Sequence, residues 1–117
     1  MARILIVEDE PDIRFMMRLI LESAGHEVTE ARGGASGLTS VKLAPPDLVI
    51  TDVMMPTMSG LEFIERLRSD PNSAAIPILV VSGNSELPAA ANARLRKPFL
   101  AQELLSAAAR LIQEAEG

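Results

Sequence analysis

Residues 47–64 read DLVITDVMMPTMSGLEFI, and the fold can be worked out from this stretch. Asp47 to Thr51 is a short, mostly apolar run, as expected for a strand that is buried on both faces of a sheet. The run ends at Asp52, and a turn containing Met-Met-Pro follows. Ser59 and Gly60 are typical of a helix start. The stretch therefore predicts a strand, a polar strand end and a helix.

The same alternation of strand and helix patterns continues on both sides of this unit. Short β-branched runs predict strands, and apolar residues at helical spacing predict the helices between them. The expected strands are Arg3–Val7, His26–Ala31, Asp47–Thr51, Ile76–Val81 and Ala93–Arg96, and the expected helices are 12–24, Gly34–Leu43, Ser59 to Asp70 and Leu100–Glu114. Such alternation predicts an α/β doubly wound, five-stranded parallel sheet with helices on both faces.

Composition narrows the classes of function. The chain has 117 residues, of which 48% are hydrophobic, so we expect a single domain spanning residues 1–117. No apolar run is long enough to cross a bilayer, and we expect a cytoplasmic protein without a membrane partner. A net charge of −5 argues against nucleic acid as a partner. The absence of cysteine excludes disulfides and thiolate sites, so a metal would bind to oxygen or to His26.

Polar side chains stand at the ends of the expected strands, where ligands bind in open parallel sheets. They are Glu8, Asp9, Asp52, Ser82 and Lys97. Three carboxylates that meet at one edge repel each other, so the site calls for a cation, and Mg²⁺ prefers such oxygen ligands. Asp52 is then a candidate nucleophile for a phosphoryl group, because Mg²⁺ and Lys97 can neutralise the charge on the phosphoryl oxygens. The Ser82 hydroxyl can donate a hydrogen bond to one of these oxygens.

Four motifs closely resemble the receiver domains of bacterial response regulators, and the resemblance spans the whole chain. The motifs are ILIVEDE at 4–10, DLVITDVMMPTMSGLEFI at 47–64, ILVVSG at 78–83 and RKPF at 96–99. The resemblance implies a flavodoxin-like, CheY-like sheet of strand order 2-1-3-4-5. It also implies phosphoryl transfer from the phosphohistidine of a sensor histidine kinase or histidine phosphotransfer protein, followed by altered binding to a downstream protein target that the sequence does not identify.

The resemblance also implies a role for each site residue. Glu8 and Asp9 match the acidic pair that binds Mg²⁺, and Asp52 matches the phosphorylated aspartate. Ser82 matches the switch residue and Lys97 the phosphate-binding lysine, whose bond to the following proline is expected to be cis.

Positions outside this set matter in the family as well. Met54 matches a position that coordinates Mg²⁺ through its backbone carbonyl, and Met54 and Asn84 match positions that tune the lifetime of the phosphoryl group. Arg14, Phe15 and Arg18 lie on the helix that is the expected kinase-docking face.

The chain departs from the family in two places. Arg94 occupies the position of an aromatic residue whose rotation accompanies the switch, so we expect that readout to be absent or replaced by an ion pair. Ser82 and Lys97 are only 15 residues apart, which leaves little room for a crossover helix. We therefore expect the fourth helix of the family to be short or missing, reduced at most to one turn from Pro88 to Ala91.

Two alternatives follow from these features. The first is a binding module that has kept the fold but signals without phosphorylation, which Arg94 and the short crossover favour. The second is a phosphatase of the haloacid dehalogenase type, which also uses an aspartate, Mg²⁺, a hydroxyl and a lysine. That class should end its first strand in Asp-x-Asp, whereas Glu8, Asp9 and Glu10 stand here.

Overall fold

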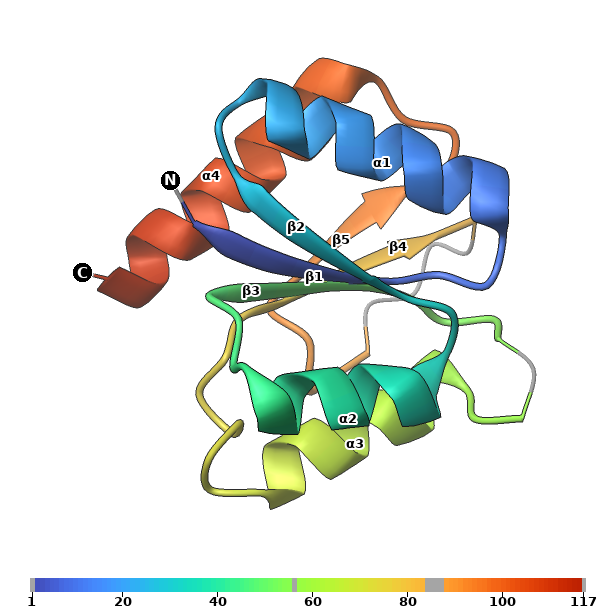
Figure 1. Cartoon of the computed structure of the whole chain (residues 1–117), viewed down its shortest axis with the longest axis vertical. Coiled ribbons are helices and arrows are strands. Elements are labelled where there is room, and N and C mark those ends of the chain that lie inside the picture. The colour runs from blue at the N-terminus through green and yellow to red at the C-terminus, as the bar shows by residue number, and fades with distance from the viewer. Residues whose placement is uncertain (1, 56, 84–87, 117) are drawn as a thin grey trace.

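The computed structural model describes residues 2–55, 57–83 and 88–116. Five parallel strands form one sheet of order β2-β1-β3-β4-β5, which confirms the predicted fold class. Helices α1 and α4 cover one face of this sheet, and α2 and α3 cover the other (Figure 1). None of the helices in the described ranges has both the length and the apolar character that crossing a membrane requires. The elements are β1 (Arg3–Val7), α1 (Pro11–Ser23), β2 (Glu27–Ala31), α2 (Gly34–Leu43), β3 (Leu48–Asp52), α3 (Gly60–Ser69), β4 (Ile78–Ser82), β5 (Ala93–Arg96) and α4 (Ala101–Glu116).

The expected bounds of β1, α2 and β5 are confirmed, and those of the other elements differ from the observed ones by one or two residues. β3 begins at Leu48 because Asp47 acts as a turn residue, whose carboxylate accepts a hydrogen bond from the backbone N–H of Arg3 at 2.8 Å. β4 begins at Ile78, after Pro77, which has no N–H to donate to a neighbouring strand. At their other ends, both strands extend one residue further than expected, so Asp52 and Ser82 are their last residues.

Two apolar layers hold the helices to the sheet. The residues of β3 and β4 are buried on both faces, as expected for central parallel strands. One layer lies between the sheet and helices α1 and α4, and it includes Met17, Leu21 and Leu104. The other lies against α2 and α3 and includes Phe63 and Leu67. The sheet is thus packed on both faces, and the carboxyl ends of its parallel strands lie along one edge.

The crossover from β4 to β5 is short, as the spacing predicts. Its described residues, 83 and 88–92, contain a turn in which the N–H of Ala91 donates to the carbonyl of Pro88 at 3.0 Å, and no helix. Asn84 lies outside the described residues. Arg68 of α3 holds this segment by donating to the Asn92 side-chain oxygen at 2.7 Å and to the Ala90 carbonyl at 3.0 Å. The crossover is thereby tied to α3.

Gly60 allows α3 to begin directly against the backbone of β3. A Cβ atom at Gly60 would lie 2.1 Å from the carbonyl oxygen of Asp52 and 2.6 Å from the Cα of Val53. The N–H of Gly60 donates to the Val53 carbonyl at 2.8 Å, and the Ser59 side chain caps the helix by accepting from the N–H of Glu62. The first residue of α3 therefore packs directly against the backbone of Asp52 and Val53.

We predict that Gly60→Ala lowers the free energy of unfolding by about 1 to 3 kcal/mol, because the methyl group has no room beside Asp52. Urea unfolding followed by circular dichroism measures the change. Gly83→Ala is the matched control, since a Cβ there meets no atom of the described residues within 4 Å, and it should change stability by less than about 0.5 kcal/mol. Equal stabilities for the two variants would contradict the close approach.

Candidate functional site

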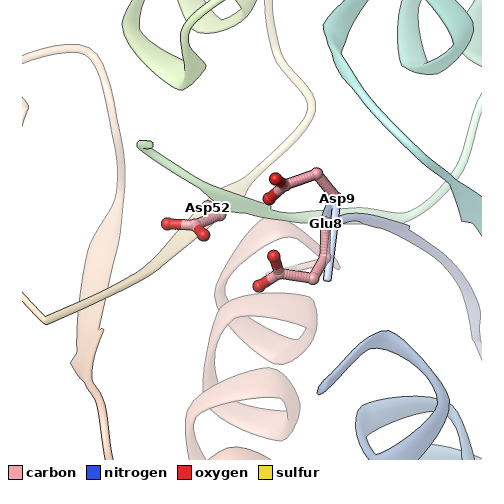
Figure 2. Close-up of side chains that lie close together, drawn as sticks. All are labelled: Glu8, Asp9 and Asp52. Carbon is pink, nitrogen blue, oxygen red and sulfur yellow. The ribbon is translucent and has the colours of Figure 1, made fainter. Parts of the chain in front are cut away.

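Three carboxylates meet at the carboxyl ends of β1 and β3. One oxygen from each of Glu8, Asp9 and Asp52 lies within 4.8 Å of the others. Figure 2 shows the three side chains gathered at this edge of the sheet. Glu8 and Asp52 are 1% and 8% exposed, whereas Asp9 is exposed to solvent. The site is therefore a group of like charges with one open side.

Backbone N–H groups orient the two buried carboxylates. The N–H of Val53 donates to Oδ1 of Asp52 at 2.7 Å, and that of Met54 donates to the same oxygen at 3.3 Å. Glu8 follows β1 directly, and its Oε2 accepts from the N–H of Glu10 at 3.1 Å. Both side chains are held by the chain immediately after a strand, so the sheet determines where they point.

Lys97 brings a positive charge to this edge. Its Nζ lies 2.9 Å from Oε1 of Glu8 and 3.1 Å from Oδ2 of Asp52. Lys97 follows β5 directly, and its backbone N–H donates to the Ser82 carbonyl at 2.8 Å. The bond from Lys97 to Pro98 is cis, as expected from the resemblance. The first, third and fifth strands thus meet in one ion-pair network.

Burial and hydrogen bonds change the pKa values of Glu8 and Lys97. Burial raises the pKa of Glu8, and the hydrogen bond from Lys97 offsets only part of this effect. Burial alone would lower the pKa of Lys97, but its hydrogen bonds to Glu8 and Asp52 raise it above the usual value. Lys97 therefore stays protonated at neutral pH.

The donor set fits a divalent cation with a preference for oxygen. Three carboxylates face one ammonium, so negative charge remains in excess in this cluster, and no cysteine or histidine belongs to it. Mg²⁺ binds such oxygen donors and keeps part of its water shell, which the exposed side at Asp9 accommodates. Glu8, Asp9 and Asp52 are the side chains that would hold the ion.

The other expected site residues take different positions. Ser82 is buried at the end of β4, the strand that pairs with β3. The Met54 side chain is 77% exposed, while its backbone contacts Asp52. Arg94 on β5 is exposed, and within the described ranges no carboxylate forms an ion pair with it. Asn84 lies outside these ranges.

Two contributors to the site were not predicted from the sequence. Gly60 supports the backbone of Asp52, and Arg14 donates to the Glu8 carbonyl at 2.8 Å. Arg14 was instead expected to belong to a docking surface. The glycine after Ser59 could have suggested a close approach, but no local pattern indicates that Arg14 reaches back to Glu8.

Comparisons with known proteins find a matching family and solved structures of similar fold. A family model described as the response regulator receiver domain matches residues 4–109. Among solved structures, the chemotaxis protein CheY4 of Vibrio cholerae is similar with a TM-score of 0.90 and 34% identity, covering 95% of this chain and 98% of that one.

Curated relatives include proteins of very different length. The sensor histidine kinase TmoS of Ectopseudomonas mendocina is 41% identical in an alignment 117 positions long, which covers 94% of this chain and 12% of that kinase. Protein PilH of Pseudomonas aeruginosa is 37% identical over 82 residues, which are 70% of this chain and 68% of PilH. The chain thus spans a small part of the first relative and about two thirds of the second.

We predict two effects of Asp9→Asn. The metal-free protein becomes more stable, on the order of 1 kcal/mol, because one of three mutually repelling charges is removed. We also expect Mg²⁺ to raise the melting temperature of the unaltered protein, since a ligand that binds only the folded state stabilises it, and we expect Asp9→Asn to abolish this rise. Thermal unfolding with and without Mg²⁺ measures both effects.

Glu65→Gln provides the control for Asp9→Asn, because it makes the same charge change at an exposed position of α3 away from the site. This variant should keep the full response to Mg²⁺. An Asp9→Asn protein that still gains stability from Mg²⁺ would show that the ion binds elsewhere.

Proposed function

Because this chain belongs to the response regulator receiver domain family, we propose that Asp52 accepts a phosphoryl group from the phosphohistidine of a sensor histidine kinase or histidine phosphotransfer protein. The observation that carries the proposal is the position of the Asp52 carboxylate. It is almost buried at the end of β3, beside two further carboxylates and 3.1 Å from the Lys97 ammonium. The chain is then a phosphoacceptor that assists its own modification.

The transfer is a displacement at phosphorus. A carboxylate oxygen of Asp52 forms a bond to phosphorus while the bond from phosphorus to the donor imidazole breaks, and the imidazole keeps the electron pair. The backbone N–H groups of Val53 and Met54 hold the carboxylate in one orientation. Lys97 is protonated and close, so its ammonium can bind a phosphoryl oxygen as negative charge accumulates there.

Glu8, Asp9 and Asp52, with the backbone carbonyl of Met54, would hold Mg²⁺ in this site. The bound ion supplies positive charge to the oxygens of the transferring group and lowers the repulsion between that group and the carboxylates.

The phosphorylated chain would then bind a downstream protein target differently. Ser82 is buried on the neighbouring strand, one residue beyond Val81, the register partner of Asp52, so a hydrogen bond from its hydroxyl to the phosphoryl group would displace the end of β4. Arg94 stands in place of the family's aromatic residue and is exposed, so this movement is transmitted without a rotating ring. Met54 and Asn84 are proposed to set the lifetime of the phosphoryl group.

An apolar surface on α1 fits the phosphohistidine-bearing partner. Phe15, Met16 and Leu19 are 57%, 42% and 51% exposed on this helix, which begins next to the acidic cluster. Arg14 and Arg18 are already engaged in ion pairs with Glu30, so the apolar side chains are the better candidates for docking.

A phosphorylation-independent binding module is the second candidate, favoured by the exposed Arg94 and by the lack of a helix in the described part of the crossover. No observation favours a phosphatase of the haloacid dehalogenase type. The single-domain organisation, the cytoplasmic location and the exclusion of nucleic acid and membrane as partners stay predictions.

We predict that incubation with acetyl phosphate adds one phosphoryl group, that the addition requires Mg²⁺, and that it is lost in Asp52→Ala. Intact-mass spectrometry detects the adduct directly. Asp12→Asn is the control, because it removes another exposed carboxylate beside the site and should leave the adduct in place. A folded, Mg²⁺-binding protein without an adduct would favour the binding module.

We predict that Phe15→Ala slows transfer from a phosphorylated histidine phosphotransfer protein about tenfold, the effect of losing one well-packed side chain at an interface. The reaction with acetyl phosphate should not change, because that donor needs no docking surface. Leu43→Ala removes an even more exposed apolar side chain, from α2, and is the control. Equal slowing with both donors would place the effect of Phe15 in the site and not in docking.

A further inference from the structure

Arg14 connects three elements next to the acidic cluster. It lies near the start of α1, and its side chain is only 15% exposed. Its Nη1 donates to the backbone carbonyl of Glu8 at 2.8 Å, and its Nε pairs with Oε1 of Glu30 on β2 at 2.9 Å. The guanidinium therefore bridges the loop after β1 and the neighbouring strand.

The hydrogen bond from Arg14 to the Glu8 carbonyl affects the orientation of the Asp9 backbone. This carbonyl belongs to the peptide unit that joins Glu8 to Asp9, and a peptide unit is planar, so fixing the oxygen also fixes the N–H of Asp9. The N–H of Glu8 donates to the Ala31 carbonyl at 3.1 Å. Glu8 is thus held on both sides of its backbone, on one side by β2 and on the other by Arg14.

We propose that Arg14 is a positioning residue for the cation site: it holds the peptide between Glu8 and Asp9 so that both carboxylates face Asp52. The inference rests on the proposed function, because it assumes that these carboxylates bind Mg²⁺. It assigns Arg14 to metal binding and not to kinase docking, although the residue lies on the expected docking helix.

Arg18 provides a matched comparison on the same helix. Its Nη1 pairs with Oε2 of Glu30 at 2.6 Å, and its Nε pairs with Glu22 at 3.1 Å. Both arginines pair with Glu30 and carry the same charge. Of the two, only Arg14 donates a hydrogen bond to the loop after β1 in the described residues. A difference between variants at the two positions therefore isolates the contact with the Glu8 carbonyl.

The experiment measures the dissociation constant of Mg²⁺ by isothermal titration calorimetry on metal-free protein. The variants are Arg14→Met, Arg14→Lys, Arg18→Met and Glu30→Gln. We expect about tenfold weaker binding for Arg14→Met, in line with the loss of a group that orients metal ligands. Arg14→Lys should show a smaller loss. Its ammonium keeps the positive charge and can keep one of the two contacts, but it cannot serve both partners of the planar guanidinium. Arg18→Met and Glu30→Gln should stay within about twofold of the unaltered protein.

The kinetics with acetyl phosphate provide a second readout. Arg14→Met should need about tenfold more Mg²⁺ for half-maximal phosphorylation but reach the same rate at saturation, a split that a general loss of structure would not produce. Arg14→Lys keeps the charge and guards against a failure of Arg14→Met to fold.

Unchanged Mg²⁺ affinity in both Arg14 variants, or an equal loss in Arg18→Met, would overturn the inference while the adduct at Asp52 still forms. Absence of that adduct in the unaltered protein would instead overturn the proposed function.

Discussion

The Lys97 ammonium contacts two nearly buried carboxylates, 2.9 Å from Glu8 and 3.1 Å from Asp52, and the rest of the site is arranged around this contact. Burying two carboxylates next to each other without a cation would be costly, because each charge loses its water and repels the other. Lys97 offsets part of that cost and joins the ends of the first, third and fifth strands. Asp9 adds a third carboxylate on the exposed side, which leaves excess negative charge for a divalent ion to neutralise.

The carboxylates keep their positions because their backbones are held. Gly60 brings the start of α3 against the carbonyl of Asp52, and the N–H groups of Val53 and Met54 hold its side chain. On the other side, Arg14 and Ala31 hold the backbone of Glu8. The site residues thus lie at the ends of strands in a sheet that is packed on both faces, and the loops contribute hydrogen bonds. Such preorganisation suits a transfer reaction that depends on position and charge.

The crossover from β4 to β5 and the edge strand β5 differ more from the family pattern than the acidic site does. In the described part of the crossover, which contains no helix, Arg68 donates hydrogen bonds to the carbonyls of Ala74, Ile76 and Ala90 and to the side chain of Asn92. Asn92 also accepts from the N–H of Ile78 at 2.8 Å. Arg94 is exposed on β5, the edge strand of the sheet. We therefore propose that output from the site uses contacts other than the rotating ring of typical receivers.

The sequence by itself determined the order of the elements, the parallel sheet and the residues at the strand ends. Hydrophobic periodicity and the polar residue that follows an apolar run are local properties, because they depend only on residues that are close in the sequence. Asp52, Glu8, Asp9 and Lys97 could all be found in this way. Only the tertiary structure decided that Arg14 reaches the Glu8 carbonyl, that Gly60 lies against Asp52, and which carboxylates Lys97 pairs with. Glu8 and Lys97 are 89 residues apart. A contact over that separation depends on how five strands and four helices pack together, and no local pattern of residues encodes its distance or direction.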